Sequence, residues 1–424
     1  MIGILIAVLF ALMIISVPIS FSLAGTSLVG FFLTDTSLEA LAQKMITAIA
    51  KYSLLPLPFF VFSGALMSQG GLSTRMIAVV RTFIGHKTGG VAIVTVGSAM
   101  LFSSVSGSSS ATTAAIGMVL IPAMVAHQYP REYASSLTAV CAELGMIIPP
   151  SISMIIFGVA TETSIVKLFA AGFFPGIMIG LVLMAFSYIV SKKRGYVGME
   201  KCSWSQRIAA VKDAWQALLM PVVVLGGIYA GIFTATESAI VSVAYAFIVG
   251  AFVYKEITWE GFKKAVTDSL VTIGIVTMVI AAALSFAFLL TREQVPQMAA
   301  DFFTSIAPNA TIFLLLINIL LIITGLFFDS TSCVSVFSVI LTPVAVAFGI
   351  DPVHFGIIMI VNMALGCVTP PVGVNLFVAC RIGQVTIEKM IKELVPFWIV
   401  LIGTLMIITY VPEISLFLPN LMGK

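Results

Sequence analysis

Long runs of residues without a single charge constrain this chain more than any other feature of its sequence. The 424 residues are 60% hydrophobic and only 9% charged, with a mean hydropathy of +1.16. The runs free of Asp, Glu, Lys and Arg are 1–34, 52–74, 88–130, 168–191, 216–236, 238–254, 269–291, 302–328, 330–350, 352–380 and 394–412. Because a membrane-spanning helix needs about 20 apolar residues, they predict an all-α polytopic membrane protein with roughly ten crossings or partial crossings.

This composition excludes several classes of protein. A soluble enzyme, a nucleic-acid-binding protein or a secreted disulfide scaffold would need a polar surface that the chain does not have. Helical spans are favoured over a β-barrel because the runs are continuously apolar and do not alternate. The first run, 1–34, is too long for a signal peptide and is interpreted as a retained span. The five cysteines show no paired spacing and are interpreted as reduced packing residues.

The sequence repeats itself at an offset of 221 residues. The stretch 144–150, with the sequence LGMIIPP, matches 365–371, with the sequence LGCVTPP. The same offset places Pro122 on Pro343. Self-similarity at one fixed offset indicates duplication of a structural unit. We therefore expect the chain to contain the same fold unit twice.

The distribution of Lys and Arg indicates that the two copies have opposite orientations. Loop 191–213 is strongly basic, whereas its counterpart one offset later, the C-terminal tail, is charged only at Glu413 and Lys424. Loop 71–88 carries Lys and Arg but no acid, whereas 292–309 carries more acid than base. Cytoplasmic loops hold the excess of basic residues, so the charge bias changes side between the copies. Inverted repeats of this kind are typical of secondary transporters, which bind substrate at the repeat interface.

Two short amphipathic stretches, 34–53 and 255–268, each precede a hydrophobic run. We expect them to lie along the membrane surface as arm helices that brace a static frame around a mobile part. The alternative is that they are ordinary solvated connectors.

A polar segment, 103–113, lies in the middle of the charge-free run 88–130 and carries eight hydroxyl side chains. Non-helical backbone is tolerated at membrane depth only where it is buried in protein or faces water. The segment is therefore predicted to be the tip of a re-entrant hairpin. The counterpart segment, 324–335, is predicted to be a second hairpin that enters from the other face.

Each predicted hairpin is followed by a helix broken at a Pro-Pro pair. Proline has no N–H, so carbonyls before the pair lose their helical partners and can bind a ligand. Neutral oxygens beside the end of a hairpin helix suit a sodium ion. The predicted sodium sites are Ser103, Ser106, Gly145, Ile148 and Pro150 for the first, and Thr324, Gly325, Gly366 and Thr369 for the second. The alternative is that the prolines only kink the helices for packing.

Few ionisable residues fall within the predicted spans, where a central charge costs roughly 2.5–3.5 kcal/mol on insertion scales. Asp329, at the second hairpin tip, is interpreted as functional. Arg292 either binds a carboxylate, which its planar guanidinium fits, or anchors the end of a span. Glu143 and Glu237 are interpreted as buried structural carboxylates.

Two small polar residues stand just beyond the breaks, Ser153 after the first and Asn375 after the second. Either they cap the following helix or they bind a polyol or a carboxylate. The residue types fit both roles equally well.

With these motifs in place, the sequence resembles the large membrane subunit of tripartite ATP-independent periplasmic (TRAP) transporters. The matching stretches are LPFFV at 57–61, SGSS at 106–109, GMIIPPS at 145–151, GVATE at 158–162, GIFTATE at 231–237 and TPPVGVN at 369–375. They occur in order along nearly the whole chain, so the resemblance is specific.

The resemblance implies a sodium-driven secondary transporter of the elevator type, in which a domain with two hairpins moves past a scaffold. It implies an organic acid as the substrate, because the family's substrates include C4-dicarboxylates and sialic acid. It also implies that Ser108, Ser153, Arg292 and Asp329 contact the substrate. One membrane-embedded arginine among many hydroxyls favours sialic acid over a dianion.

The resemblance further implies two partners and a location in the bacterial inner membrane. The partners are a small four-span membrane subunit and a periplasmic binding protein that delivers the substrate. No extension like the small subunit precedes Met1, so we expect that subunit to be a separate chain. Nucleic acid is not an expected partner.

Within this interpretation the chain divides into five segments. The first repeat supplies a scaffold with an arm helix (1–88) and a transport-domain hairpin with a broken helix (89–162). A scaffold segment with the cytoplasmic loop and second arm helix follows (163–268). The second hairpin and broken helix (269–394) and a C-terminal scaffold helix (395–424) complete the chain.

Other classes of protein fit the sequence less well. A stand-alone sodium/anion symporter with the same hairpins is the nearest alternative, and co-purification of a small membrane chain would distinguish it. An intramembrane serine hydrolase needs a base beside the Gly/Ser cluster, but His86, His127 and His354 lie at or near the ends of loops or spans. A channel would need a continuous polar lining, and no P-loop motif for ATP occurs. We therefore expect a transporter and not an enzyme.

Overall fold

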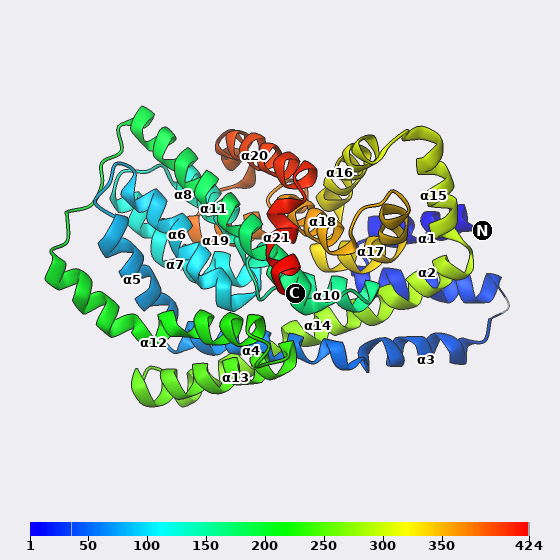
Figure 1. The fold of residues 1–424 in the computed structure, drawn as a ribbon, viewed down its shortest axis with the longest axis horizontal. Helices are drawn as coiled ribbons and strands as arrows, with labels where there is room; N and C mark the ends of the chain where they lie inside the picture. The colour runs from blue at the N-terminus through cyan, green and yellow to red at the C-terminus, as the bar shows by residue number, and fades with distance from the viewer. Residues whose placement is uncertain (35, 423–424) are drawn as a thin grey trace.

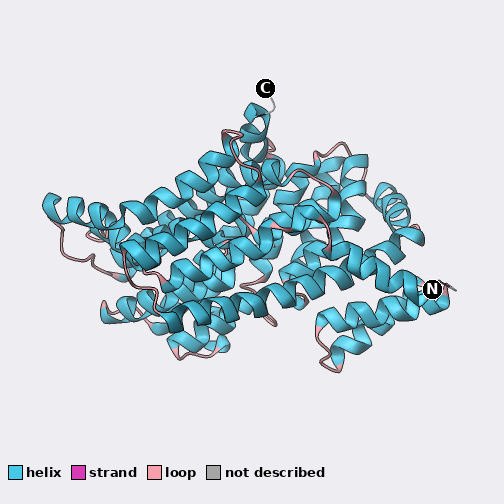
Figure 2. Cartoon of the chain, turned by 90° about the horizontal axis from the view of Figure 1, so that it is seen from below, coloured by secondary structure: helices cyan, strands magenta, loops and turns pink. Residues whose placement is uncertain are grey.

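The computed structural model describes residues 1–34 and 36–422, and every regular element within them is a helix (Figures 1 and 2). Among these described residues, eight helices are long and apolar enough to cross a membrane, and the total is up to ten if each of two bent pairs is one span. The eight are α7 (Ser109–Ala126), α11 (Ile165–Arg194), α12 (Trp204–Tyr229), α13 with its π-helical end (Ala235–Val253), α14 (Trp259–Arg292), α16 (Ala310–Phe327), α17 (Ser330–Ala347) and α20 (Ile387–Tyr410). The predicted all-α polytopic membrane protein is confirmed.

The helices repeat at the offset found in the sequence. The pairs related by it are α6 (Gly90–Ser106) with α16, α7 with α17, α8 and α9 (Arg131–Ala142, Leu144–Ile147) with α18 (Pro352–Gly366), α10 (Ile152–Thr161) with α19 (Val374–Gly383), and α11 with α20 and α21 (Glu413–Met422). Both Pro-Pro pairs contain a cis peptide bond. The two halves of the chain therefore build the same unit.

The two units are inverted. Arg194, the last residue of α11, forms an ion pair with Glu393 near the start of α20, with an N–O distance of 2.9 Å. The end of α11 therefore meets the start of its counterpart, so equivalent helices run in opposite directions. We call the side of the molecule that carries Lys192, Lys193 and Arg194 the basic face, and the other side the opposite face. The excess of basic residues assigns the basic face to the cytoplasm.

The two predicted re-entrant hairpins are present as α6–α7 and α16–α17, on either side of the molecule in Figure 1. The first turns at Gly107, whose φ of +64° is a conformation that favours glycine. The second helix of each hairpin starts at a side-chain cap. Ser108 Oγ accepts the Ala111 N–H (3.4 Å), and Asp329 Oδ2 accepts the Ser332 N–H (3.1 Å).

The arm helices differ between the repeats. The first predicted arm forms a separate helix, α3 (Leu38–Ile49), and the following segment bends away from it by 52°. The second predicted arm does not form a separate helix, because α14 continues unbroken from Trp259 to Arg292. The physical reason is local. Pro56 opens α4 (Pro56–Gln69) and cannot continue a preceding helix, whereas its counterpart Thr277 keeps its N–H.

Two further amphipathic helices lie in stretches that were predicted to be loops, 71–88 and 292–309. They are α5 (Leu72–Ile84) and α15 (Val295–Ile306). Each directly precedes the first helix of a hairpin, α6 or α16. They are therefore the connections through which each hairpin is attached to the helices before it.

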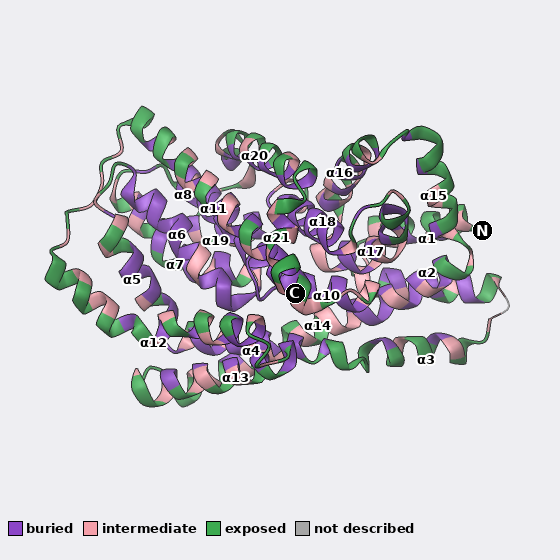
Figure 3. Cartoon of the chain, in the orientation of Figure 1, coloured by how far each residue is buried: buried purple, intermediate pink, exposed green. Residues whose placement is uncertain are grey.

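Burial is concentrated in the hairpins and broken helices (Figure 3). All described residues of α18 from Val353 to Gly366 are buried, whereas α3 and α12 expose much of their surface. Many exposed residues are large and apolar, as Leu270, Ile275 and Ile319 are. Such an exterior fits lipid, and the polar segments with broken backbone lie inside it.

Candidate functional site

The two broken helices meet at the centre of the molecule. Met146 and Cys367 are equivalent residues of the two repeats, and their sulfur atoms are 4.0 Å apart. Each lies in the stretch just before a Pro-Pro pair. The two breaks therefore face each other across the axis that relates the repeats, as expected for a site at the interface of inverted repeats.

In the first repeat, the hairpin tip packs directly on the break. The Ile152 N–H donates to the Gly107 carbonyl (3.2 Å). A Cβ atom on Gly145 would lie 2.7 Å from the Ser108 carbonyl oxygen, so the glycine permits this contact. The Ser106 hydroxyl lies 2.8 Å from that of Thr112 and orders the tip internally.

The structure brings the residues of the first predicted sodium site into one region. Ser103 and Ser106 lie in the last turn of α6, and Gly145, Ile148 and Pro150 lie in the break that contacts this hairpin. The Ser103 hydroxyl is fully buried and has no hydrogen-bond partner among the described residues. A buried hydroxyl without a partner costs free energy, so it is a suitable ligand for a cation.

The second predicted site is also assembled. Gly325 and Gly366 are in backbone contact, because a Cβ on Gly366 would lie 2.7 Å from the Gly325 carbonyl oxygen. The hydroxyls of Thr324 and Thr369 donate to carbonyls one turn earlier in their own helices (3.1 and 2.7 Å). Unlike that of Ser103, these hydroxyls are already satisfied by protein.

A cavity of about 340 Å³ lies between the first hairpin and the helices α4 and α14. Its polar lining includes Ser106, Ser108, Ser110, Gln69, Asp268 and Thr272. Gln69 ends α4, and Gly70 beside it contacts Gly250 near the basic-face end of α13. The cavity therefore reaches toward the basic face.

The other predicted substrate contacts lie elsewhere in this conformation. Ser153 is buried in α10, one residue beyond Ile152, which lines the cavity. Asp329 caps α17 at the second hairpin tip. Arg292 is exposed at the end of α14 and donates to the Thr36 hydroxyl. The roles predicted for these three residues in substrate binding stay predictions.

Two features of the site were not identified from the sequence. The first is the contribution of α4 and α14 to the cavity lining, through Gln69 and Asp268. The second is a hydrogen bond between Asn375 Nδ2 and Glu143 Oε1, which joins the two repeats. Glu143 was interpreted as a structural carboxylate, but its partner lies 232 residues away. The expectation that Glu237 is buried is wrong. It is exposed and caps its own helix, because its side chain accepts the Thr234 N–H at 2.8 Å at the start of α13.

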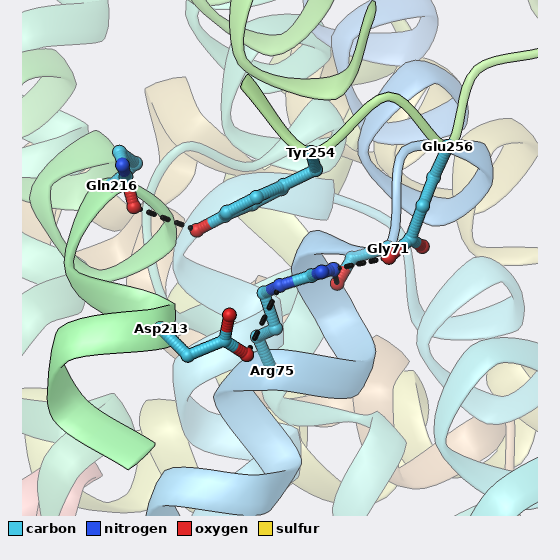
Figure 4. Close-up of polar contacts among 6 residues, drawn as sticks. All are labelled: Gly71, Arg75, Asp213, Gln216, Tyr254 and Glu256. Atoms are coloured by element: carbon cyan, nitrogen blue, oxygen red, sulfur yellow. Dashed lines mark hydrogen bonds and ion pairs between the residues drawn. The ribbon is translucent and has the colours of Figure 1, made fainter. Parts of the chain in front are cut away.

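One arginine, Arg75 of α5, links several elements at the basic face, close to the end of α4 (Figure 4). Arg75 of α5 forms ion pairs with Asp213 (3.2 Å) and Glu256 (2.6 Å) and donates to the Gly71 carbonyl (3.1 Å). Its guanidinium also lies 3.8 Å from the centre of the Tyr254 ring. This cluster joins α5 to α12 and to the segment between α13 and α14.

Replacing Arg75 with methionine should lower the free energy of unfolding in detergent by about 2 kcal/mol. Both acids are partly exposed, so each ion pair contributes at most about 1 kcal/mol, and the aromatic contact adds a similar amount. Lysine at this position should be intermediate, because it cannot reproduce the forked geometry. Chemical unfolding checks the effect, which should shrink at high salt. Arg81, exposed on the same helix and without an ion pair among the described residues, gives the control variant Arg81→Met; an equal loss there would contradict the assignment.

Comparisons with known proteins agree with this architecture. The family model described as the DctM component of tripartite ATP-independent periplasmic transporters matches residues 6–414. The chain is 40% identical to the C4-dicarboxylate TRAP transporter large permease protein DctM of Pseudomonas aeruginosa over 404 residues, covering 95% of this chain and 94% of that protein. It is 37% identical to the sialic acid TRAP transporter large permease protein SiaM of Vibrio cholerae over 411 residues, covering 97% of this chain and 96% of that protein.

The fold is also found in a solved structure. The Alcanivorax borkumensis YdaH transporter, described as having an unusual topology, superposes with a TM-score of 0.65 over 88% of each chain at 13% identity. The apolar spans and the paired hairpins define a multi-pass membrane protein built from two inverted repeats. By the family match over almost its whole length, this chain belongs to the DctM component family of tripartite ATP-independent periplasmic transporters.

Proposed function

We propose that this protein is the large permease of a TRAP system and carries out sodium-coupled uptake of an organic acid across the bacterial inner membrane. The observation that carries the proposal is the cavity of about 340 Å³ between the serine-rich hairpin tip and α4 and α14. Its volume lies in the usual range for small-molecule sites. The names of the two relatives support a C4-dicarboxylate or sialic acid as the substrate class.

The proposed mechanism is an elevator. A moving part, made of the hairpins and broken helices (α6–α10 and α16–α19), carries the substrate past a frame made of α1–α4 and α12–α14. Here α1 is Ile2–Ile14 and α2 is Ile19–Leu33. We assign α14 to the frame because it packs along α2, α3 and α4, although it also contacts α17 of the moving part. This assignment differs from the sequence-based division, which began the second transport segment at residue 269.

Sodium is proposed to bind where the hairpin tips meet the breaks. The buried, unpartnered hydroxyl of Ser103 supports the first site. Backbone contact between Gly325 and Gly366 supports an equivalent position in the second repeat. An ion bound there would hold each tip against its break and so stabilise the arrangement that closes over the substrate.

Membership of a tripartite family supports two proposed partners. One is a small membrane subunit, and the other is a periplasmic binding protein that delivers the acid. Failure of a small membrane chain to co-purify, with transport intact, would favour a stand-alone symporter with the same fold.

Uptake into proteoliposomes, with both partners supplied, tests the proposed function. We expect uptake of sialic acid or a C4-dicarboxylate to stop when choline replaces sodium. In Ser103→Ala, the sodium concentration for half-maximal uptake should rise about tenfold, equivalent to about 1.4 kcal/mol for one lost ligand. The matched control is Ser104→Ala, because the Ser104 hydroxyl already donates to the Leu101 carbonyl (2.6 Å). Sodium-independent uptake by the wild type would refute the coupling.

A further inference from the structure

One lysine side chain bonds the frame to the moving part at the opposite face. Lys51 Nζ donates to the Val159 carbonyl, with a distance of 3.2 Å. Lys51 stands between α3 and α4, and Val159 lies in the last turn of α10. Because α11 starts at Ile165 and ends on the basic face, this contact lies on the other side of the molecule from the cavity.

The inverted repeat shows what happens at the equivalent place on the basic face. Thr272 is the repeat counterpart of Lys51. Val378 is the counterpart of Phe157, which lies two residues before Val159. Thr272 and Val378 both line the cavity of about 340 Å³. The frame and the moving part therefore contact each other at the opposite face, whereas a cavity separates them at the equivalent place on the basic face. When the transporter changes state, the closed side must open at Lys51.

The cavity lining identifies the frame residues that the opened side would expose. On α14 the lining residues are Ala265, Asp268, Ser269 and Thr272, which share one helix face. Their counterparts one offset earlier are Lys44, Thr47, Ala48 and Lys51. The basic-face cavity thus carries an acid from the frame. At the opposite face the frame places Lys51 just after the end of α3, at the position equivalent to Thr272.

A pocket already exists beside Lys51 in the present conformation. It has a volume of about 550 Å³ and is lined by Lys51, Ser53, Thr163, Ser164, Thr234 and Thr236 among others. Glu162 also lines it, but no ion pair joins Glu162 to Lys51 within the part of the chain that the structure describes. Among the described residues, the ammonium of Lys51 has a single hydrogen-bond partner, the neutral Val159 carbonyl.

We propose that Lys51 binds the carboxylate of the entering organic acid at the opposite face. In the present state the Val159 carbonyl accepts the hydrogen bond that the carboxylate would accept. The ammonium already makes a charge-assisted hydrogen bond to the Val159 carbonyl, but a carboxylate adds the Coulomb attraction of a full negative charge. The arriving acid therefore displaces Val159 and releases the contact that keeps this side closed. Asp268 at the exit repels the same anion. This inference rests on the proposed function.

The test measures uptake as a function of the concentration of substrate-loaded binding protein, with the complete complex in proteoliposomes. In Lys51→Met the half-saturating concentration should rise about tenfold, the loss of one charge-assisted hydrogen bond, while the maximal rate changes less than twofold. Lys51→Arg should keep the wild-type value. The control is Lys167→Met, which removes the same charge from an exposed position near the start of α11 on the same face.

A second measurement follows the closed contact itself. Without substrate, a membrane-impermeant maleimide should label Thr163→Cys at least threefold faster when Lys51→Met is also present than when Lys51 is retained, because the Val159 contact is gone. An unchanged half-saturating concentration in Lys51→Met, or an equal rise in Lys167→Met, would overturn the proposal. If the proposed function itself were wrong, the wild-type complex would show no sodium-dependent uptake at all, so the two failures are distinguishable.

Discussion

Alanine at Gly366 or Gly145 should reduce sodium-dependent uptake at least tenfold. These two glycines are equivalent in the two repeats, and each lies where a break meets a hairpin tip. The Cβ of Gly366→Ala would lie 2.7 Å from the Gly325 carbonyl oxygen and 2.8 Å from its Cα. Both are backbone atoms, so the clash can be relieved only by moving the tip away from the break. Overpacking of this kind costs about 1–3 kcal/mol.

Two other glycines provide matched controls for this prediction. Gly274 and Gly403 also lie within helices, but a Cβ on either would meet no atom within 4 Å. In a helix interior, alanine is more stable than glycine by up to about 1 kcal/mol. Gly274→Ala and Gly403→Ala should therefore leave the stability unchanged or raise it slightly. Uptake rates normalised to the amount of assembled complex separate the two groups. Wild-type uptake by Gly366→Ala would show that the tip and the break do not need this close contact.

The hairpins and breaks were predictable because their signals are local. A Pro-Pro pair removes two N–H groups wherever it falls, and serines at 103–113 have no reason to lie in hydrocarbon unless protein or water surrounds them. The inversion of the repeats was predictable from the charge bias of the loops. The structure confirms both, through the two hairpins and through the ion pair of Arg194 with Glu393.

The cavity was not predictable in the same way, because it depends on which helix faces meet. The apolar runs of α4 and α14 identify spans, but nothing in them shows that Gln69 and Asp268 face the first hairpin tip. For the same reason, the apolar context of Arg292 did not reveal that its side chain reaches Thr36 at a helix end.

The arm helices could have been predicted more accurately. Pro56 marks a helix start and Thr277 does not, so the difference between α3 and α14 is already present in the sequence. The amphipathic periodicity of 72–84 and 295–306 also predicts the helices α5 and α15. The charges in these stretches indicated only the orientation of the two repeats relative to the membrane. The repeat offset led us to expect two similar arms, and a single proline made them different.

Asn375→Ala should be among the most destabilising single changes in this chain. Asn375 is fully buried, and its Nδ2 donates to Glu143 Oε1, the only hydrogen bond to this carboxylate among the described residues. Glu143 is 2% exposed, so without Asn375 it would remain buried with no donor. Leaving a buried polar group without its hydrogen-bond partner costs about 1–3 kcal/mol, and more where the group is charged. Thermal unfolding in detergent should show a large fall in the midpoint temperature, and uptake should be lost because this bond joins the two repeats.

The double variant Glu143→Met, Asn375→Ala separates this explanation from a simple packing defect. Replacing both partners removes the orphaned carboxylate, and methionine can fill the irregular space that remains. The double variant should therefore be more stable than Asn375→Ala alone, although it carries one more substitution. Glu143→Gln should stay near the wild type in stability, because its amide oxygen can accept the same hydrogen bond. If the losses measured for Glu143→Met and Asn375→Ala separately simply add in the double variant, Glu143 and Asn375 do not act as a pair. The link between the repeats must then lie in apolar contacts such as that of Met146 with Cys367.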